Sequence, residues 1–250
     1  MNASPTRTPV PPPPSANVDP GELAKFAELA HHWWDPESAM FAPLHRMNPL
    51  RLEWIQSAAS GLAGKRVVDV GCGGGILTEA MAACGAEALG IDLGEKALGV
   101  ARLHKLESGS PANYRLVAAE ALAAEAPQAF DVVTCMELLE HVPDPLSLVA
   151  ACAKLVKPDG VVIVSTINRT VKAYALAVVG AEYVLGLLPK GTHDYAKFLT
   201  PAEVAAFARR AGLAPSAITG VAYNPFEKSF RRVGETGVNY MMAFRRAAHG

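Results

Sequence analysis

The sequence lacks several features that would assign the protein to a specialised class. Its 250 residues include only four cysteines, and no two of these stand at C-x-x-C spacing. This argues against a cysteine zinc site or a disulfide framework, so we expect reduced, mostly buried thiols. Lys and Arg number 23 against 24 Asp and Glu, which gives a net charge of -1. Without an excess of positive charge, a nucleic-acid partner is not expected.

Long apolar runs are also missing. No segment reaches the roughly 20 apolar residues that span a bilayer, and the closest, residues 173–188, is interrupted by Glu182. The first 20 residues are rich in proline and small polar residues and contain no apolar signal-peptide core. We therefore expect a disordered tail over residues 1–20 and a cytoplasmic protein.

What the sequence has is the composition of a folded α/β protein. Half of the residues are hydrophobic (50%) and 19% are charged, the balance of a chain that buries a core. Two helices are predicted before the first strand, at 21–34 and 49–60. Thr200 and Glu203 form a capping box around Pro201, so a helix is expected to begin there.

Short apolar segments alternate with segments of helical spacing through the middle of the chain. They predict parallel strands at residues 66–70, 86–91, 114–118, 130–136 and 161–166. Residues 216–223 and 238–244 predict a late antiparallel hairpin whose strands are joined by a polar excursion. The expected fold is a Rossmann-like, mainly parallel seven-stranded sheet with helices on both faces.

The most informative stretch runs from Asp69 to Gly75 and reads DVGCGGG. It lies between a predicted strand and a predicted helix, where glycines let a ligand approach the backbone, and the next strand ends at Asp92, where an acid can bind ribose hydroxyls. A G-x-G-x-x-G dinucleotide fingerprint is incomplete because position 76 is isoleucine. Asp69, just before the loop, favours a cationic ligand over a pyrophosphate. The pattern is typical of class I S-adenosylmethionine-dependent methyltransferases, with Gly71 and Gly73 against the cofactor.

Several further stretches are specific enough to narrow the class. They include Trp33 to Asp35, Pro43 to Arg51, Cys135 to Pro145, Pro189 to Asp194, and Val238 to Met241. Together with the glycine loop they resemble the bacterial O-methyltransferases of ubiquinone biosynthesis, from about residue 18 to residue 244. The resemblance implies O-methylation of two polyprenylated catechol intermediates. It also implies a peripheral position at the inner face of the cell membrane and partners among the other enzymes of that pathway.

The resemblance also implies cofactor contacts. It places them at Arg51, Gly71, Asp92 and Met136, with Arg51 reaching the methionine carboxylate from the N-terminal helices. An arginine in that place indicates a lid formed by residues 21–62. Met136 ends a predicted strand, where a thioether can pack on adenine, although an ordinary core methionine is equally consistent with the position.

Methyl transfer to a phenol needs a device that makes the oxygen nucleophilic, because a free phenol titrates near ~10. A general base or a divalent cation can do this. If residues 137–141 form one helical turn, Glu137, Glu140 and His141 share a face and suit a Mg, Mn or Zn site. Without a metal, His141 or His193, the latter oriented by Asp194, would serve as the base.

The chain divides into five predicted parts. The tail (1–20) and the helical lid (21–62) precede a cofactor-binding core (63–168), an apolar insertion (169–199) and the remainder of the core (200–250). The insertion is too short to span a bilayer and too apolar for a simple surface helix. It predicts either a patch that docks on the membrane or a buried lid over the substrate.

Two other functions remain open from the sequence alone. One is methylation of a different phenol or lipid by an enzyme of the same fold. The other is a non-catalytic, cofactor-binding scaffold in a biosynthetic complex. Methyl transfer from labelled cofactor separates the scaffold from both enzymes, and substrates with long and short tails separate the two enzymes.

Overall fold

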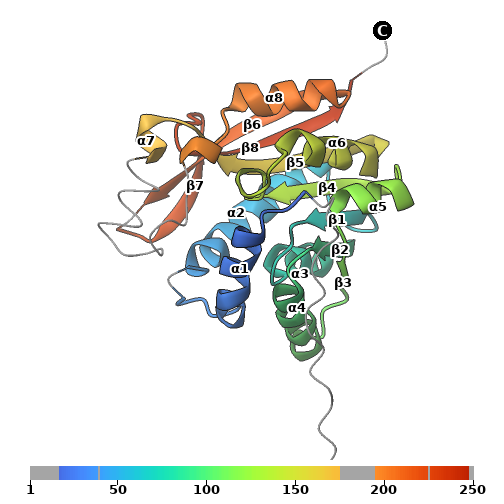
Figure 1. Cartoon of the computed structure of the whole chain (residues 1–250), viewed down its shortest axis with the longest axis vertical. Coiled ribbons are helices and arrows are strands. Elements are labelled where there is room, and N and C mark those ends of the chain that lie inside the picture. Colours follow the sequence, from blue (N-terminus) through green and yellow to red (C-terminus); the bar gives the residue numbers. More distant parts are fainter. Residues whose placement is uncertain (1–16, 39, 175–194, 225, 248–250) are drawn as a thin grey trace, which may run out of the picture.

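A single mixed sheet organises the molecule in the computed structural model, which describes residues 17–38, 40–174, 195–224 and 226–247 (Figure 1). Its eight strands lie in the order β3-β2-β1-β4-β5-β8-β6-β7. They are β1 (Arg66–Val70), β2 (Glu87–Asp92), β3 (Asn113–Leu116), β4 (Phe130–Met136), β5 (Val156–Ile167), β6 (Leu213–Asn224), β7 (Ser229–Val233) and β8 (Asn239–Arg246). The pairs from β3 to β5 are parallel, whereas β8, β6 and β7 pair antiparallel. The Rossmann-like fold class is thereby confirmed.

The expected number of seven strands is wrong by one. The polar excursion between the last two predicted strands contains β7, which pairs with β6 from Gly220↔Val233 to Asn224↔Ser229. Its sequence, SFRRV, is mostly polar, and all five of its side chains are half-buried or exposed. The strand exists because β6 extends past the core and offers a free edge.

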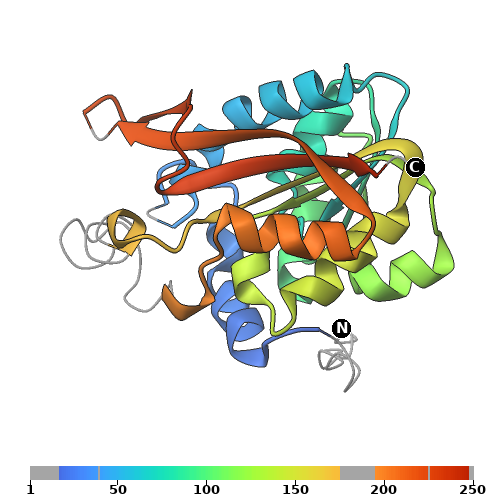
Figure 2. The ribbon, with the colours of Figure 1, turned by 90° about the horizontal axis from the view of Figure 1, so that it is seen from above.

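Helices cover both faces of the sheet (Figure 2). Apolar side chains of α5 (Ala119–Glu125), α6 (Pro145–Leu155) and α8 (Pro201–Arg210) share one core cluster with the strands. Those of α2 (Ala42–Ala59) and α3 (Ile76–Ala83) form the core on the opposite face. Helix α4 (Glu95–Ser108) packs beside β2 and β3. The carboxyl ends of the parallel strands are left for a ligand.

The helix predictions are confirmed in part. The capping box at Thr200 and Glu203 is present, and α1 (Pro20–Leu29) continues into a short 3-10 turn, η1 (Ala30–His32). The predicted start of the second helix at Pro49 is wrong, because α2 begins at Ala42 and Pro49 lies inside it. Proline at position 49 has no N–H to donate to the His45 carbonyl. The helix nevertheless continues past Pro49, because the parts of α2 on both sides of it pack on the core.

Two sequence predictions fall largely outside the described residues. The proline-rich tail is described only from residue 17, and the apolar insertion only at its two ends, including the short helix α7 (Val171–Ala173). Within the described parts of the chain, no helix is long and apolar enough to cross a membrane.

Candidate active site

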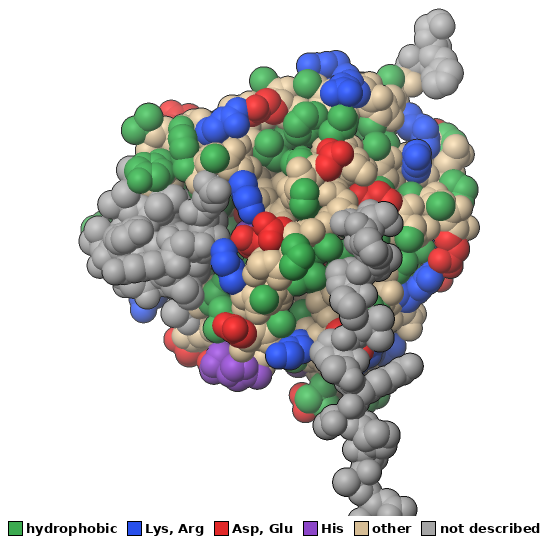
Figure 3. All heavy atoms as spheres, in the orientation of Figure 1, with side chains coloured by type: hydrophobic (Ala, Val, Ile, Leu, Met, Phe, Trp, Pro, Cys, Tyr) green, Lys and Arg blue, Asp and Glu red, His purple; other side chains and the backbone are tan. Residues whose placement is uncertain are grey.

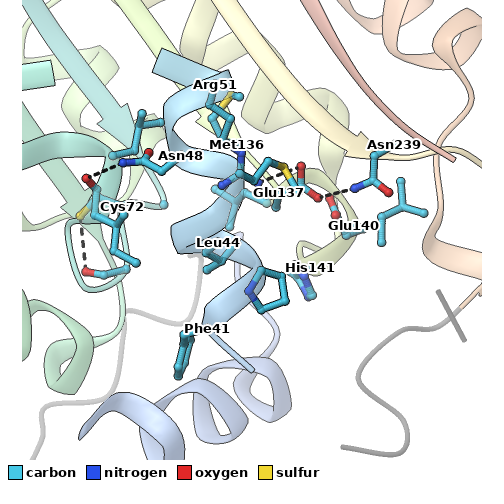
Figure 4. A pocket seen from close by; sticks show the side chains of 18 of the residues that line it. Phe41, Leu44, Asn48, Arg51, Cys72, Met136, Glu137, Glu140, His141 and Asn239 are labelled. Carbon is cyan, nitrogen blue, oxygen red and sulfur yellow. Dashed lines mark hydrogen bonds and ion pairs between the residues drawn. The ribbon is translucent and has the colours of Figure 1, made fainter. Parts of the chain in front are cut away.

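One large cavity opens at the carboxyl ends of the parallel strands, with a volume of about 1290 Å³. Its lining includes every residue predicted to contact the cofactor: Arg51, Asp69, Gly71, Gly73, Asp92 and Met136. Glu137, Glu140 and His141 line the same cavity, and Figure 4 shows these side chains gathered beside α2. His193 lies outside the described residues. The structure therefore brings together all the predicted site residues that it describes.

The glycine loop is closely packed on both sides. Gly71 and Gly73 have φ angles of 74° and 51°, a backbone conformation that favours glycine. A Cβ on Gly71 would stand 2.6 Å from Leu138, and one on Gly73 only 2.0 Å from Trp33. The glycines thus make a cradle that side chains would fill.

Asp92 organises this cradle at the end of β2. Its carboxylate accepts hydrogen bonds from the backbone N–H groups of Gly73 (2.9 Å) and Gly94 (2.6 Å). Burial raises the pKa of Asp92 from its usual value, and the backbone donors partly offset this. The carboxylate is held at the loop with further acceptor capacity directed at the cavity that it lines.

Asp69 lies beneath the loop and is only 3% exposed. Thr78 and Thr134 each donate a hydroxyl hydrogen bond to it at 2.7 Å. Burial nevertheless raises the pKa of Asp69 to about 6. A cation bound on the loop would favour its ionised form, which agrees with the expectation of a cationic ligand.

Two tryptophans hold the loop from outside, a role that the sequence did not reveal. Trp34 donates its Nε1–H to the Gly74 carbonyl at 2.8 Å, and its ring stacks on His104 of α4 with centroids 3.4 Å apart. The Nδ1 of His104 lies 3.1 Å from Glu79 on α3. Trp33 packs against the same loop. Trp33 and Trp34 belong to a stretch that carries the family resemblance, but no local sequence pattern predicts the residues that they contact.

Arg51 of α2 provides unused hydrogen-bond donors at the cavity. It is 5% exposed, and its Nη2 lies 3.2 Å from Oε1 of Glu137. This ion pair is not a hydrogen bond, and within the described residues neither Nη2 nor Nε of Arg51 has a hydrogen-bond partner. Buried guanidinium donors without partners are costly, so this arginine suits an anionic ligand group such as a carboxylate. The glycine cradle, Asp92 and Arg51 together fit S-adenosylmethionine.

Glu137 follows β4, lines the cavity and bonds to side chains of β5 and β8. Its Oε1 accepts from the Ser165 hydroxyl of β5 at 2.6 Å, and its Oε2 from the Asn239 amide of β8 at 3.3 Å. Its own N–H bonds the Ser165 carbonyl at 3.0 Å, with φ at 51°. Ser165 and Asn239 are site residues that sequence reasoning did not assign, because their partner lies 28 and 102 positions away.

The predicted metal site is not formed by the described residues. Residues 139–141 make a 3-10 turn rather than continuing a helix from Glu137, so the three side chains take different partners. Glu140 accepts from Thr166 at 2.8 Å, and His141 Nδ1 bonds Glu22 of α1 at 2.9 Å. Among the residues that the structure covers, no three His, Cys, Asp or Glu side chains are arranged to hold a metal.

Glu140 and His141 are neighbours in the sequence but have different surroundings. Burial, reinforced by the charge of Glu137, raises the pKa of Glu140 to about 8, which favours a neutral acid at pH 7. The ring of His141 packs edge-on against Phe26 with centroids 5.4 Å apart. Since Nδ1 donates to the Glu22 carboxylate, Nε2 is the basic nitrogen of the ring. Glu22 and Phe26 both belong to α1, so this helix helps to orient His141.

Met136 has a different environment from the polar residues. It is 8% exposed and shares the core cluster of Met47 and Leu77, on the face covered by α2 and α3. It also lines the cavity. A contact with adenine stays a prediction.

The N-terminal segment crosses the same edge of the sheet. Asn17 donates to Glu120 Oε1 (3.1 Å) and to the Asp144 carbonyl (2.7 Å), so it connects the starts of α5 and α6. Asp19 pairs with Lys197 at 3.1 Å. Residues 17–34 therefore contribute to the wall of the cavity from outside the sheet.

Comparison with known proteins agrees with this geometry. The methyltransferase domain family matches residues 43–217. The chain is 64% identical over 231 residues to the ubiquinone biosynthesis O-methyltransferase of Ralstonia nicotianae, covering 92% of this chain and 96% of that protein. It is also 64% identical over 233 residues to that of Thiobacillus denitrificans, covering 93% and 100%.

Solved structures share the fold at low identity. Magnesium protoporphyrin IX methyltransferase from Synechocystis, crystallised with bound S-adenosylhomocysteine (SAH), has a TM-score of 0.63 at 20% identity, covering 84% of this chain and 86% of that one. A methyltransferase from Thermotoga maritima has a TM-score of 0.62 at 17% identity, covering 90% and 100%.

Fold, cradle and relatives together define an S-adenosylmethionine-dependent methyltransferase that acts on oxygen. Within this class, the chain belongs to the family of ubiquinone biosynthesis O-methyltransferases.

Proposed function

We propose that this enzyme methylates polyprenylated catechols at both O-methylation steps of ubiquinone biosynthesis. The observation that carries the proposal is a single cavity shared by the cofactor cradle and the polar cluster around Glu137. Its volume of about 1290 Å³ exceeds the roughly 300–1,000 Å³ typical of a site for one drug-sized ligand. Two ligands can therefore lie in contact, as an in-line transfer requires.

The cofactor half holds the methyl donor. When bound, S-adenosylmethionine supplies an electrophilic methyl group on a sulfonium. In our proposal, Asp92 binds the ribose hydroxyls and the unpartnered donors of Arg51 bind the methionine carboxylate. The buried carboxylate of Asp69 favours positive charge above it. The loop backbone positions the cofactor and takes no part in the methyl transfer itself.

The polar cluster activates the phenol. His141, with its tautomer set by Glu22, accepts the proton of the reacting hydroxyl at Nε2. Glu137, held by Ser165 and Asn239, accepts a hydrogen bond from the second hydroxyl of the catechol. Two adjacent hydroxyls would thus be recognised by different groups, which orients the ring for transfer. His193 remains a second predicted base.

No step is assigned to a divalent cation, because the described donors already have protein partners. Turnover in excess chelator tests the sequence-based prediction of Mg, Mn or Zn. Loss of activity that added cation restores would show that Glu137, Glu140 and His141 rearrange around a metal when substrate binds. Unchanged turnover of cation-free protein would leave proton removal to a side chain.

Peripheral membrane association and contacts with other enzymes of the pathway also belong to the proposal. Their support is the substrate class, since a polyprenyl tail partitions into the bilayer. Co-sedimentation of the purified protein with vesicles and with lysate membranes measures both associations.

The central experiment is methyl transfer from labelled S-adenosylmethionine to catechols with long and short polyprenyl tails. We expect methylation of both, with a lower KM for the long tail. Asp92→Ala should weaken cofactor binding by about 1.5–3 kcal/mol, through loss of charged hydrogen bonds. Absence of methylation on every catechol, in protein that binds the cofactor by calorimetry, would overturn the proposed substrate class.

A further inference from the structure

The hydrogen bond between Asn239 and Glu137 relates the β6–β7 hairpin to the polar cluster. Val221 of β6 stands directly opposite Asn239 of β8 in the antiparallel register, so their side chains share one face of the sheet. On that face the Asn239 amide donates to Glu137 at 3.3 Å. A hydrophobic side chain therefore lies beside the group that holds Glu137 in place.

The same face of the hairpin continues with aromatic side chains. Side chains alternate along a strand, so Tyr223 lies on the face of Val221, two residues closer to the turn. Phe230 of β7 stands opposite Tyr223 in the register, and the centroids of the two rings lie 4.9 Å apart. Two residues of an antiparallel strand advance about 7 Å. The apolar strip thus extends about that far from Val221 towards the hairpin turn.

Helix α2 lies against this face of the hairpin. Arg232, which stands opposite Val221, pairs with Glu53 of α2 at 2.7 Å. Met47 of α2 and Val221 belong to one core cluster, and Phe230 packs against that cluster. Figures 1 and 2 show the hairpin reaching past the rest of the sheet beside α2, and Figure 3 shows hydrophobic and basic side chains at the surface of this end.

The apolar strip is also part of the active-site cavity. Met47, Val221, Tyr223 and Phe230 all line it, and we call these four residues the hairpin wall. Exposure increases outwards along the wall, because Val221 is 5% exposed, Phe230 is half-buried and Tyr223 is 39% exposed. The hairpin wall therefore leads from the polar cluster towards solvent.

A different apolar wall of the cavity serves the cofactor half. Trp33 stacks on Phe41 with ring centroids 4.4 Å apart, and it packs against Gly73 of the cradle. A ligand on the glycine loop meets these rings. A substituent on a ring bound at Glu137 instead meets Val221, through the pairing of Val221 with Asn239.

We propose that the hairpin wall binds the first two isoprene units of the substrate tail and so determines the preference for prenylated over plain catechols. An isoprenoid chain is narrow and apolar, and it gains free energy when it is buried against hydrophobic side chains. The length of the strip, about 7 Å, matches an extended chain of one to two such units. The assignment of the ligand rests on the proposed function, in which the catechol lies at Glu137.

Calorimetry on the full chain, saturated with S-adenosylhomocysteine, measures this preference without turnover. The probes are catechol, prenylcatechol with one isoprene unit and geranylcatechol with two. For the wild type we expect the Kd to fall about tenfold with each added unit, since burial of about 60 Å² of apolar surface changes binding by that factor.

Two variants break the hairpin wall at its outer end. Phe230→Ala should reduce the gain from two units from about a hundredfold to about tenfold, because one side of the wall is lost. Tyr223→Asp places a charge beside the second unit, so geranylcatechol should bind no more tightly than prenylcatechol. Tyr223 is 39% exposed, so its replacement tests the wall even if loss of the half-buried Phe230 ring unfolds the chain.

Phe226→Ala is the matched control. Phe226 belongs to the turn of the same hairpin, but it is 96% exposed and lies outside the cavity lining. This variant should keep the full gain from two units. Equal Kd values of the wild type for all three probes would overturn the proposal. The full gain in Tyr223→Asp, or an equal loss in Phe226→Ala, would overturn it as well.

Methyl transfer to the same three probes tests the proposed function separately. If the binding gains and their loss in the variants appear while no probe is methylated, the hairpin wall is supported and the proposed reaction is wrong. If all three probes are methylated but bind with equal Kd values, the proposed reaction is supported and the role of the hairpin wall is wrong.

Discussion

The two halves of the active-site cavity are built by different means. The cofactor half comes from a short stretch of chain, residues 69–94, in which backbone groups and one acid form the cradle. The polar half assembles side chains from the end of β4, from β5 and from β8, whose positions range from Glu137 to Asn239, and Arg51 of α2 lies between the two halves. The first half is a local structure that many sequences can form, whereas the second exists only once the whole sheet has formed.

The largest expected effect breaks the cofactor half. Gly73→Ala places a Cβ 2.0 Å from Trp33 at a φ of 51°. Steric overlap and left-handed backbone strain together should lower the free energy of unfolding by about 2–5 kcal/mol. Urea titration measures it. Gly99→Ala, where a Cβ meets no atom within 4 Å on helix α4, should instead stabilise the protein by up to ~1 kcal/mol.

A pH experiment examines the acid beneath the cradle. The folded-state pKa of Asp69, about 6, lies above its usual 3.8, so between these values the folded protein binds the proton more tightly. Stability from this group is therefore greatest at low pH and falls as pH rises through that window, by roughly 3 kcal/mol at most. Asp69→Asn should lack this slope when the free energy of unfolding is measured from pH 4 to 7. Parallel curves for both proteins would contradict the assignment.

Ser165→Ala tests whether the polar half can be weakened without affecting the cofactor half. It removes a 2.6 Å hydrogen bond to Glu137, and bonds to charged groups contribute about 1.5–3 kcal/mol. We expect kcat/KM for the catechol to fall about tenfold to a hundredfold while cofactor affinity by calorimetry is unchanged. Ser216→Ala, which removes a hydroxyl bonded to the Ala243 carbonyl away from the cavity lining, is the control. A matching loss of cofactor affinity in Ser165→Ala would mean that the two halves are not separable.

The smallest effect concerns the outer support of the loop. Trp34→Phe keeps a ring on His104 but loses the hydrogen bond to the Gly74 carbonyl. A neutral hydrogen bond contributes about 0.5–1.5 kcal/mol, so the cofactor Kd should rise about two- to tenfold without a change in kcat. Trp54→Phe, in the core between α2 and the sheet, should leave the Kd unaltered. A Kd that stays at the wild-type value in Trp34→Phe would show that the loop needs no outside support.

The contrast between the halves also explains what the sequence could predict. Strands β1 and β4, the glycine loop and Asp92 follow from local signals, and the structure has them where those signals place them. The arrangement of Glu137, Ser165 and Asn239 has no such signal, because only the pairing of β5 with β4 and β8 brings them together. The predicted helical turn over residues 137–141 is wrong for the same reason. The Glu137 N–H donates to the hydroxyl and carbonyl oxygens of Ser165, and Glu137 takes a left-handed conformation that interrupts the helix.

The placement of the tryptophans gives the protein its own optical reporter. Of its three tryptophans, Trp33 and Trp34 lie against the glycine loop, while Trp54 is buried in the core on the α2 side. Indole emission depends on the polarity and motion of its surroundings, so a ligand that settles on the loop should shift the fluorescence of the first two above the constant signal of the third. The stacked imidazole of His104 is a ready quencher of Trp34. Occupancy of the cofactor half can thus be followed by intrinsic fluorescence, without a label and in real time.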